Sequence, residues 1–384
     1  EFPACRPRLH LLAELADGRP SSIPDPGTSR ISLEEVCRDL SALLERGFPR
    51  IVAAAQDAEQ QRRKPLGTPA VSFDHLTLGR LLTISTDAET WAAFSAPTWQ
   101  ALLQAVLAEG VAPLLSFRLA ETGQVAMIPP AARAALRTAC LNTWRNNEEI
   151  IKELQVLARH FSQAGIPVVV LKGACFALTI YPDPGLRPMS DLDLLIPREK
   201  LPRAVEIATR LGYSNTLPEA MPGLRDLLGH DIYLQRGGLS LELHHSLVAD
   251  RVFRYAVPVD WFWTQTEPLA SPPGYNFENL AMLTPAAQML YSAAHAMLQH
   301  GGQQAPLRWF YDLHLLVQHY GSRLDWDLLI AQAREFAWAS ALEAALAHTT
   351  ACFATPIPAC VRARLAEKTD RHQKLVAAKQ VKAA

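Results

Sequence analysis

The spacing of apolar residues predicts an all-helical region at the start of the chain. Ser32 and Glu35 form a capping box ahead of leucines that recur at helical spacing. An amphipathic helix is expected from about residue 97 to residue 109, where Gly110 provides a stop signal. Residues 1–30, by contrast, are rich in Pro, Ser, Gly and Asp, and we expect them to form an irregular arm.

Two further helices are expected before the pattern changes. One begins after Pro129 and Pro130, because proline is well tolerated at the first position of a helix. The next runs from about residue 146 to residue 163 and ends at Gly165. Up to this point the sequence contains no group of residues of catalytic type, so we interpret residues 1–145 as a helical accessory region.

A small β-sheet is predicted in the middle of the chain. Residues 166–171 form a short, apolar, β-branched run, which is typical of a buried strand. Residues 190–196 form a second strand in which aspartate and leucine alternate, and an amphipathic helix follows over about 201–210. The alternating segments 230–235 and 239–245 flank a Gly-Gly pair, which predicts a tight hairpin.

The pattern becomes helical again from Thr284, which we expect to be an N-cap ahead of Pro285. The order of elements predicts an α+β fold, in which a small mixed β-sheet core is flanked by helical N- and C-terminal regions. We place this core at residues 146–275 and a C-terminal helical domain at residues 276–384. No segment approaches about 18 uninterrupted apolar residues, so no membrane span is expected.

Composition adds little to this picture. The chain has 384 residues and a formal net charge of −1, so its overall charge requires neither a nucleic-acid nor an anionic-membrane partner. Its six cysteines are scattered, without a C-x-x-C pair or the spacing of a zinc site, which favours reduced thiols. No signal peptide is visible, and a cytoplasmic location is the expectation.

Asp191 and Asp193 are the first candidates for chemistry. Residues i and i+2 of a strand point to the same face, about 6.6 Å apart along the chain. Leu192 and Leu194 point the other way, which leaves the two carboxylates on an open face. Two carboxylates in this arrangement can share a hard cation or bracket a pair of them, although an acid pair on a solvated face is also common.

Glu242 strengthens this interpretation. It lies in an alternating strand whose polar face carries Ser240, Glu242 and His244. If this strand pairs beside the Asp191–Asp193 strand, Glu242 reaches the same metal site and can complete its coordination or accept a proton. The alternative is an edge-strand acid that only prevents aggregation.

Residues suited to phosphate binding surround these acids. Lys172 and Gly173 directly follow the first strand, where a glycine lets the backbone approach a phosphate and a following helix directs N–H groups at it. Arg187 and Ser190 precede the acid pair and are placed to meet phosphate oxygens. Each also has an ordinary structural reading, such as a solvated lysine at a strand end.

Several segments carry a family resemblance. They are Leu171-Lys-Gly173, the stretch 181–195 with its specific string Arg187-Pro-Met-Ser-Asp-Leu-Asp193, Leu241-Glu-Leu-His-His245, and the downstream residues His295, His300, Leu307-Arg-Trp309 and Asp312. Over about residues 150–320 the chain resembles the bacterial uncharacterised nucleotidyltransferases of the polymerase-β-like superfamily. The resemblance implies a small mixed sheet, two strand-borne aspartates and a third acid that bind Mg²⁺, and transfer of NMP from an NTP.

Taken together, the residues and the resemblance predict a Mg²⁺-dependent nucleotidyltransferase, with Mn²⁺ as a possible substitute and ATP as the expected nucleotide. Its acceptor would be a hydroxyl-bearing small molecule, peptide, protein or RNA. The predicted catalytic and metal-binding residues are Asp191, Asp193 and Glu242. The predicted nucleotide-binding residues are Lys172, Gly173, Arg187, Ser190, His244, Arg308 and Asp312.

One departure and two alternatives accompany this prediction. The superfamily usually has Gly-Ser after its first strand, whereas this chain has Lys172-Gly173-Ala174 and lacks the serine hydroxyl that would touch a terminal phosphate. The same fold without catalysis would give a nucleotide sensor or a scaffold protein. A sugar-nucleotide glycosyltransferase also uses Asp-x-Asp with a metal, but it normally needs a larger α/β sheet ahead of the motif.

Overall fold

The computed structural model of the chain describes residues 72–367, except for 84–87, 216–230, 248–256, 272–273 and 278. Contacts divide the chain into two compact units, Glu1–Pro69 and Ala70–Ala384, and every described residue belongs to the second. The predicted arm over residues 1–30 and the predicted helix after Ser32 lie outside the described residues.

A six-stranded mixed sheet forms the centre of the described unit. Its strand order is β3-β4-β2-β1-β6-β5, with β2 parallel to β4 and β1 parallel to β6 while the other neighbours run antiparallel. The α+β fold with a small mixed sheet is therefore confirmed. The strands are β1 (Val168–Val170), β2 (Leu192–Leu195), β3 (Asp231–Arg236), β4 (Leu239–His244), β5 (Thr266–Pro268) and β6 (Leu280–Leu283).

The four strands predicted from the sequence are present, and β5 and β6 are additions. β5 has the sequence Thr-Glu-Pro, in which the proline argues against a strand, and β6 is an apolar run, Leu-Ala-Met-Leu, that cannot be told from a buried helix segment by its pattern. The predicted hairpin joins β3 to β4, with Arg236 opposite Leu239 and a two-residue turn between them. Gly237 has a φ of +59°, a conformation that glycine adopts without steric cost, which explains the Gly-Gly pair.

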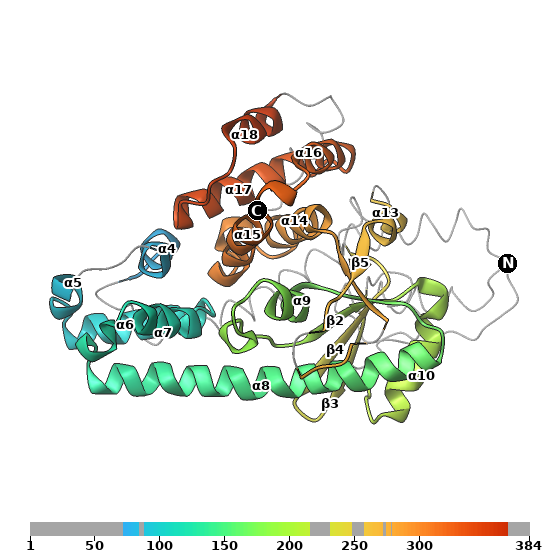
Figure 1. Cartoon of the computed structure of the whole chain (residues 1–384), viewed down its shortest axis with the longest axis horizontal. Coiled ribbons are helices and arrows are strands. Elements are labelled where there is room, and N and C mark those ends of the chain that lie inside the picture. Colours follow the sequence, from blue (N-terminus) through green and yellow to red (C-terminus); the bar gives the residue numbers. More distant parts are fainter. Residues whose placement is uncertain are drawn as a thin grey trace, which may run out of the picture. The chain divides into compact units, whose positions relative to one another are not determined.

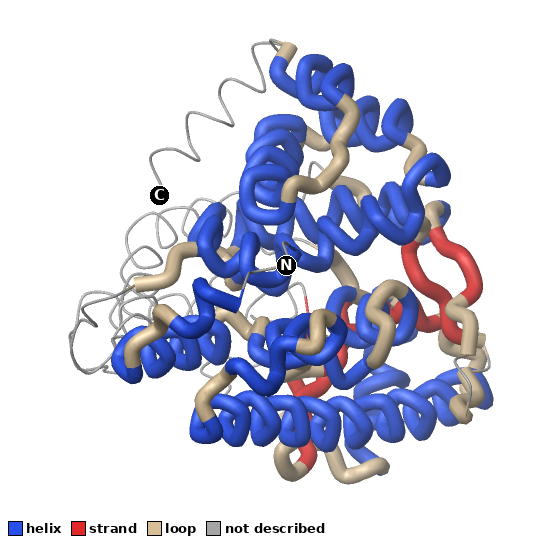
Figure 2. Tube along the Cα trace, turned by 60° about the vertical axis from the view of Figure 1, so that its left-hand side comes forward, coloured by secondary structure: helices blue, strands red, loops and turns tan. Residues whose placement is uncertain are grey.

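Helices surround the sheet and make up most of the described unit (Figures 1 and 2). They are α4 (His75–Thr83), α5 (Ala88–Ala92), α6 (Ala96–Ala108), α7 (Ala112–Glu121), α8 (Pro130–Gln163), α9 (Lys172–Thr179), α10 (Leu201–Arg210), α13 (Val259–Thr264), α14 (Pro285–Ala294), α15 (Leu307–Tyr320), α16 (Trp326–Glu335), α17 (Ala339–Phe353) and α18 (Ala359–Ala366). Shorter 3₁₀ turns occupy Gln124–Met127, Pro184–Leu186, Arg198–Lys200, Gly302–Gln304 and Gly321–Arg323, and a π-helix covers His295–Gln299.

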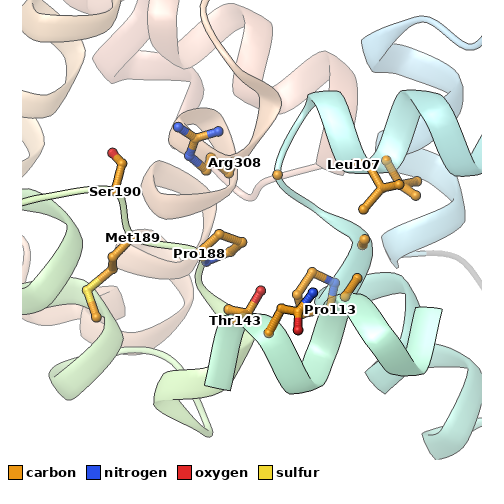
Figure 3. A pocket seen from close by; sticks show the side chains of 12 residues that line it. Leu107, Pro113, Thr143, Pro188, Met189, Ser190 and Arg308 are labelled. Atoms are coloured by element: carbon orange, nitrogen blue, oxygen red, sulfur yellow. The ribbon is translucent and has the colours of Figure 1, made fainter. Parts of the chain in front are cut away.

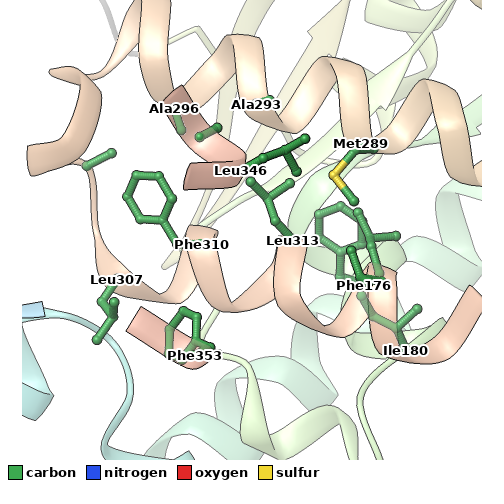
Figure 4. Close-up of a cluster of buried hydrophobic side chains, with 14 of the residues drawn as sticks. Phe176, Ile180, Met289, Ala293, Ala296, Leu307, Phe310, Leu313, Leu346 and Phe353 are labelled. Atoms are coloured by element: carbon green, nitrogen blue, oxygen red, sulfur yellow. The ribbon is translucent and has the colours of Figure 1, made fainter. Parts of the chain in front are cut away.

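The two faces of the sheet pack against different helices, as the alternation along β1 illustrates. Val168 and Val170 belong to one buried cluster with the second half of α8 and with α10, whereas Val169 belongs to another with α14, α15 and α17. Figure 4 shows part of the second cluster, where Phe176 of α9 packs near Met289 of α14 and Leu313 of α15. Each face is thus covered by helices.

Helix α8 differs from the two shorter helices that the sequence predicts. It is a single helix of 34 residues, and no glycine or proline interrupts it after Pro130. The polar stretch near residue 146, which marks a helix start in the sequence, instead contains the buried Asn147. Its side-chain amide donates hydrogen bonds of 2.7 Å to the carbonyls of Pro184 and Arg187. The polar residues therefore anchor the loop before β2, and the division proposed at residue 145 falls inside α8.

No single helix among the described residues is long and apolar enough to cross a membrane. Helices α6 and α7 satisfy such a test only as a pair, and they meet at an angle of 118°. The cysteines that the structure describes, Cys140, Cys175, Cys352 and Cys360, are all free thiols.

Candidate active site

The strand register brings two of the predicted acids side by side. In the parallel pair β2–β4, Asp193 lies directly opposite Glu242. Leu192 and Leu194 point into the cluster formed with α8 and α10, as the alternation predicts, so Asp193 points to the opposite face. The expectation that β4 pairs beside the Asp-x-Asp strand is correct.

The expectation of an open face is wrong for Asp193. Its side chain is only 4% exposed, because α14 covers this face of the sheet and places Tyr291 next to the site. Asp191 is half-buried, and the side chain of Glu242 is 24% exposed. Solvent therefore reaches the cluster through Asp191 and Glu242.

Two cationic side chains balance the charge of Asp193. Lys172 Nζ donates to Asp193 Oδ1 at 3.2 Å, and His244 Nε2 donates to the same oxygen at 2.8 Å while lying 3.3 Å from Glu242 Oε2. Burial favours the neutral acid, but Lys172 and His244 outweigh it and hold the pKa of Asp193 well below its usual range. Burial and Lys172 oppose protonation of His244, yet its hydrogen bonds to Asp193 and Glu242 raise its pKa to about 9.

The backbone of Lys172 is unusual. It has a φ of +40°, in the left-handed region, at the turn from β1 into α9. This conformation costs a residue with a side chain about 1–2 kcal/mol. The strained turn holds the ammonium on Asp193 and 5.6 Å from the centre of the Tyr291 ring. Strain of this kind, imposed by the surrounding structure, is common at functional sites.

Asp191 carries the least compensated charge of the cluster. Its Oδ2 accepts a hydrogen bond of 3.1 Å from Ser190 Oγ. Burial, followed by the charges of Asp193 and Glu242, raises its pKa from 3.8 to about 6. Asp191 is thus poised to gain a proton or a cation.

Asp191→Asn is expected to raise the melting temperature of the metal-free protein at about pH 8 by roughly 2–4 °C. Because the pKa in the folded state lies above 3.8, the charged carboxylate opposes folding fully above pH about 6, and this penalty fades as the pH falls toward 3.8. Thermal unfolding in EDTA compares the variant with the wild type at about pH 8, where the Asp191 carboxyl is charged, and at about pH 4, where it is mostly protonated. If Asp191→Asn changed the melting temperature equally at the two pH values, the raised pKa of Asp191 would be contradicted. Glu199→Gln, which replaces an exposed acid, serves as control.

The donor atoms suit a divalent metal ion. Among the residues that the structure describes, Asp193, Glu242 and His244 form the group whose ligand atoms lie within 4.8 Å of one another. Asp191 is not in that group, although its pKa responds to both other acids. Carboxylate oxygens suit Mg²⁺ and Mn²⁺, whereas an imidazole nitrogen is a donor more typical of transition metals.

A family model described as "Uncharacterised nucleotidyltransferase" matches residues 95–354, which is more than half of the chain. The chain belongs to this nucleotidyltransferase family. Comparison with curated proteins and with solved structures gives no match. The matched region starts at residue 95, directly before α6, and extends through α17, so the family covers the sheet, the acid cluster and helices on both sides of them in sequence.

Two of the predicted nucleotide-binding residues bind each other. The Arg187 guanidinium donates through Nε to Asp312 Oδ1 at 2.9 Å and through Nη2 to Oδ2 at 2.7 Å, and both side chains are at most 5% exposed. Tyr181 OH adds a hydrogen bond of 2.8 Å to Asp312. A Cβ atom on Gly173 would lie 2.8 Å from Arg187 Nη1, so this glycine makes room for the buried ion pair.

Arg308 lies apart from this ion pair, in a pocket of about 310 Å³ (Figure 3). Ser190 lines the same pocket and adjoins Asp191 in the chain. The structure thus collects the predicted residues into three neighbouring groups: the acids with Lys172 and His244, the Arg187–Asp312 pair with Gly173, and the pocket with Ser190 and Arg308.

Sequence reasoning missed Tyr291 on α14 at the candidate site, although His295 and His300 were among the residues that carry the resemblance. Tyr291 carries a buried ring next to Lys172, and α14 continues into a π-helix that begins at His295. The His295 ring lies 4.3 Å from His300 and 4.6 Å from Trp309, measured between ring centres. Burial and the charge of Lys172 lower the pKa of His295 well below its usual value. π-Helices often occur at functional sites, but this one leaves no recognisable pattern in the sequence.

Proposed function

We propose that this nucleotidyltransferase uses a divalent metal ion, Mg²⁺ or Mn²⁺, to transfer NMP from an NTP to a hydroxyl group, with ATP as the expected nucleotide. The observation that carries the proposal is the convergence of Asp193, Glu242 and His244 on one point, next to the poorly compensated Asp191. Family membership supports nucleotide transfer as the reaction class.

Asp193, Glu242 and His244 would hold the ion, with Asp191 placed to bind it or a second one. A bound ion neutralises phosphate charge and lowers the pKa of the attacking hydroxyl. A protonated His244 would have to lose its proton before its nitrogen could bind the metal. In the absence of metal, Lys172 and His244 balance the charge of the acids.

The transfer step follows from this arrangement. The acceptor oxygen forms a bond to the α-phosphorus, the bond from that phosphorus to the α,β-bridging oxygen breaks, and pyrophosphate leaves with the bonding electrons. Glu242, whose side chain is 24% exposed, accepts the proton of the hydroxyl. Lys172 and Ser190 are proposed to contact the phosphates, Lys172 by exchanging Asp193 for a phosphate oxygen.

Radiolabelled ATP tests this proposal. The protein is incubated with Mg²⁺, candidate acceptors or lysate, and either [α-³²P]ATP or [γ-³²P]ATP. Label retained only from the α position is the expected result. Retention from the γ position would instead identify a kinase. ATP binding without transfer of either label would favour the alternative function, a nucleotide sensor of the same fold.

A further inference from the structure

The pocket beside the acid cluster combines two parts of the chain. One wall consists of the loop that ends at Ser190, together with Arg308 at the start of α15. The other wall comes from helices α6, α7 and α8, including Leu107, Pro113 and Thr143 (Figure 3). Its volume of about 310 Å³ is at the lower end of the range for small-molecule sites.

Among the described residues that line the pocket, Arg308 is the only charged one. No acid among the described residues forms an ion pair with it, and its guanidinium lies 5.7 Å from the centre of the Trp309 ring. Burial is the main cause that lowers the pKa of Arg308. Gly110, with a φ of +68°, makes room for this side chain, because a Cβ atom there would lie 2.7 Å from Arg308 Nη1.

The composition of the walls limits the class of ligand. The other lining residues are apolar or neutral, including Asn142 and Thr143, so a ligand meets one positive charge and a largely apolar surface. A single guanidinium matches one carboxylate or one phosphate group in a bidentate pair. A triphosphate, with three or four negative charges, would leave most of its charge uncompensated here.

We propose that this pocket binds the acceptor of the transfer reaction, and that the acceptor is a small organic molecule with one anionic group and one hydroxyl. The inference rests on the proposed function. Arg308 binds the anionic end, the apolar walls contact the body, and the hydroxyl points past Ser190 toward Asp191. This proposal assigns Arg308 to acceptor binding, whereas the sequence analysis grouped it with the nucleotide-binding residues. Helices α6–α8 would then bind the acceptor through their side of the pocket.

Saturation-transfer NMR with matched probes tests the pocket without catalysis. Para-hydroxybenzoate and phenyl phosphate are anionic, and para-hydroxybenzamide is their neutral counterpart. Both anions are expected to bind, and the amide roughly 10- to 100-fold more weakly. Arg308→Gln should weaken anion binding by a similar factor, with Arg308→Lys intermediate. Equal binding of anions and amide, no binding of either anion, or no effect of Arg308→Gln would overturn the proposal.

Arg323→Gln is the matched control, because Arg323 also lies over an aromatic ring, 5.4 Å from the centre of Tyr320, but outside the pocket. Melting temperatures verify that all variants are folded. Addition of saturating Mg-ATP then distinguishes the two sources of an anion. Probes that remain bound support an acceptor site, whereas displacement by ATP would assign the pocket to the nucleotide and overturn the acceptor assignment. Failure of the labelling experiment alone leaves the binding result intact.

Discussion

Asp193→Asn is expected to lower the rate of nucleotide transfer on the order of 10³-fold, because the bound metal ion contributes several kcal/mol of charge stabilisation in the transition state. Asp193 is the best placed of the acids to hold the ion, since it is buried and lies opposite Glu242. The substitution keeps the size of the side chain and its hydrogen bonding to Lys172 and His244 can partly persist. Transfer of α-label from ATP measures the rate, and titration calorimetry of ATP with and without Mg²⁺ measures the metal-dependent affinity.

A second site variant and a control accompany this prediction. Glu242→Gln should also impair transfer, with less effect on folding because its side chain is partly exposed. Glu206→Gln on α10 removes an exposed acid with partners of its own and should leave the rate unchanged. An Asp193→Asn protein whose ATP affinity and transfer rate match the wild type would refute the assignment of this metal site.

Asp312→Ala is expected to reduce the free energy of unfolding by about 3–5 kcal/mol. The substitution leaves the Arg187 guanidinium buried without its carboxylate, and it also removes the acceptor of the Tyr181 hydroxyl. Because Arg187 directly precedes the loop that carries Ser190 and Asp191, the acid cluster should lose its positioning as well. Chemical denaturation of the wild type and the variant measures the change.

The double variant Arg187→Met/Asp312→Leu distinguishes a buried charge from a simple loss of packing. Replacing both members of a buried ion pair by apolar residues is often neutral or stabilising, so most of the lost free energy should return. If the double variant were as unstable as Asp312→Ala, the lost free energy of unfolding would come from altered packing rather than from the unpaired charge of Arg187.

Features that depend on local patterns were predictable from the sequence. Alternating aspartate and leucine determine which side of β2 carries Asp193, and a Gly-Gly pair determines the register of the β3–β4 hairpin. With β4 next to β2, the observed register places Glu242 beside Asp193. The alternation and the hairpin turn involve neighbours within a few residues and can be recognised from the sequence, whereas the pairing of β4 with β2 joins distant segments and entered the prediction as a condition.

Features that depend on contacts between distant segments were not predictable. Arg187 and Asp312 are separated by 125 residues, and no pattern in the sequence indicates that they bind each other rather than a nucleotide. The burial of Asp193 depends on α14, which packs over the sheet from roughly 100 residues downstream. The left-handed backbone of Lys172 is imposed by its surroundings, since lysine has no intrinsic preference for it.

Helix α8 also has a mechanical consequence. Its first half packs on α6 and α7, and its second half packs under the strands. A helix about 50 Å long without interior glycine or proline offers no hinge. Helices α6 and α7, which form part of the pocket wall, and the strands that carry Asp193 and Glu242 therefore pack against the same straight helix, and we expect no hinge movement between them along α8. Ligands must enter a preformed space, so the backbone of α6–α8 should superpose closely in free and loaded protein.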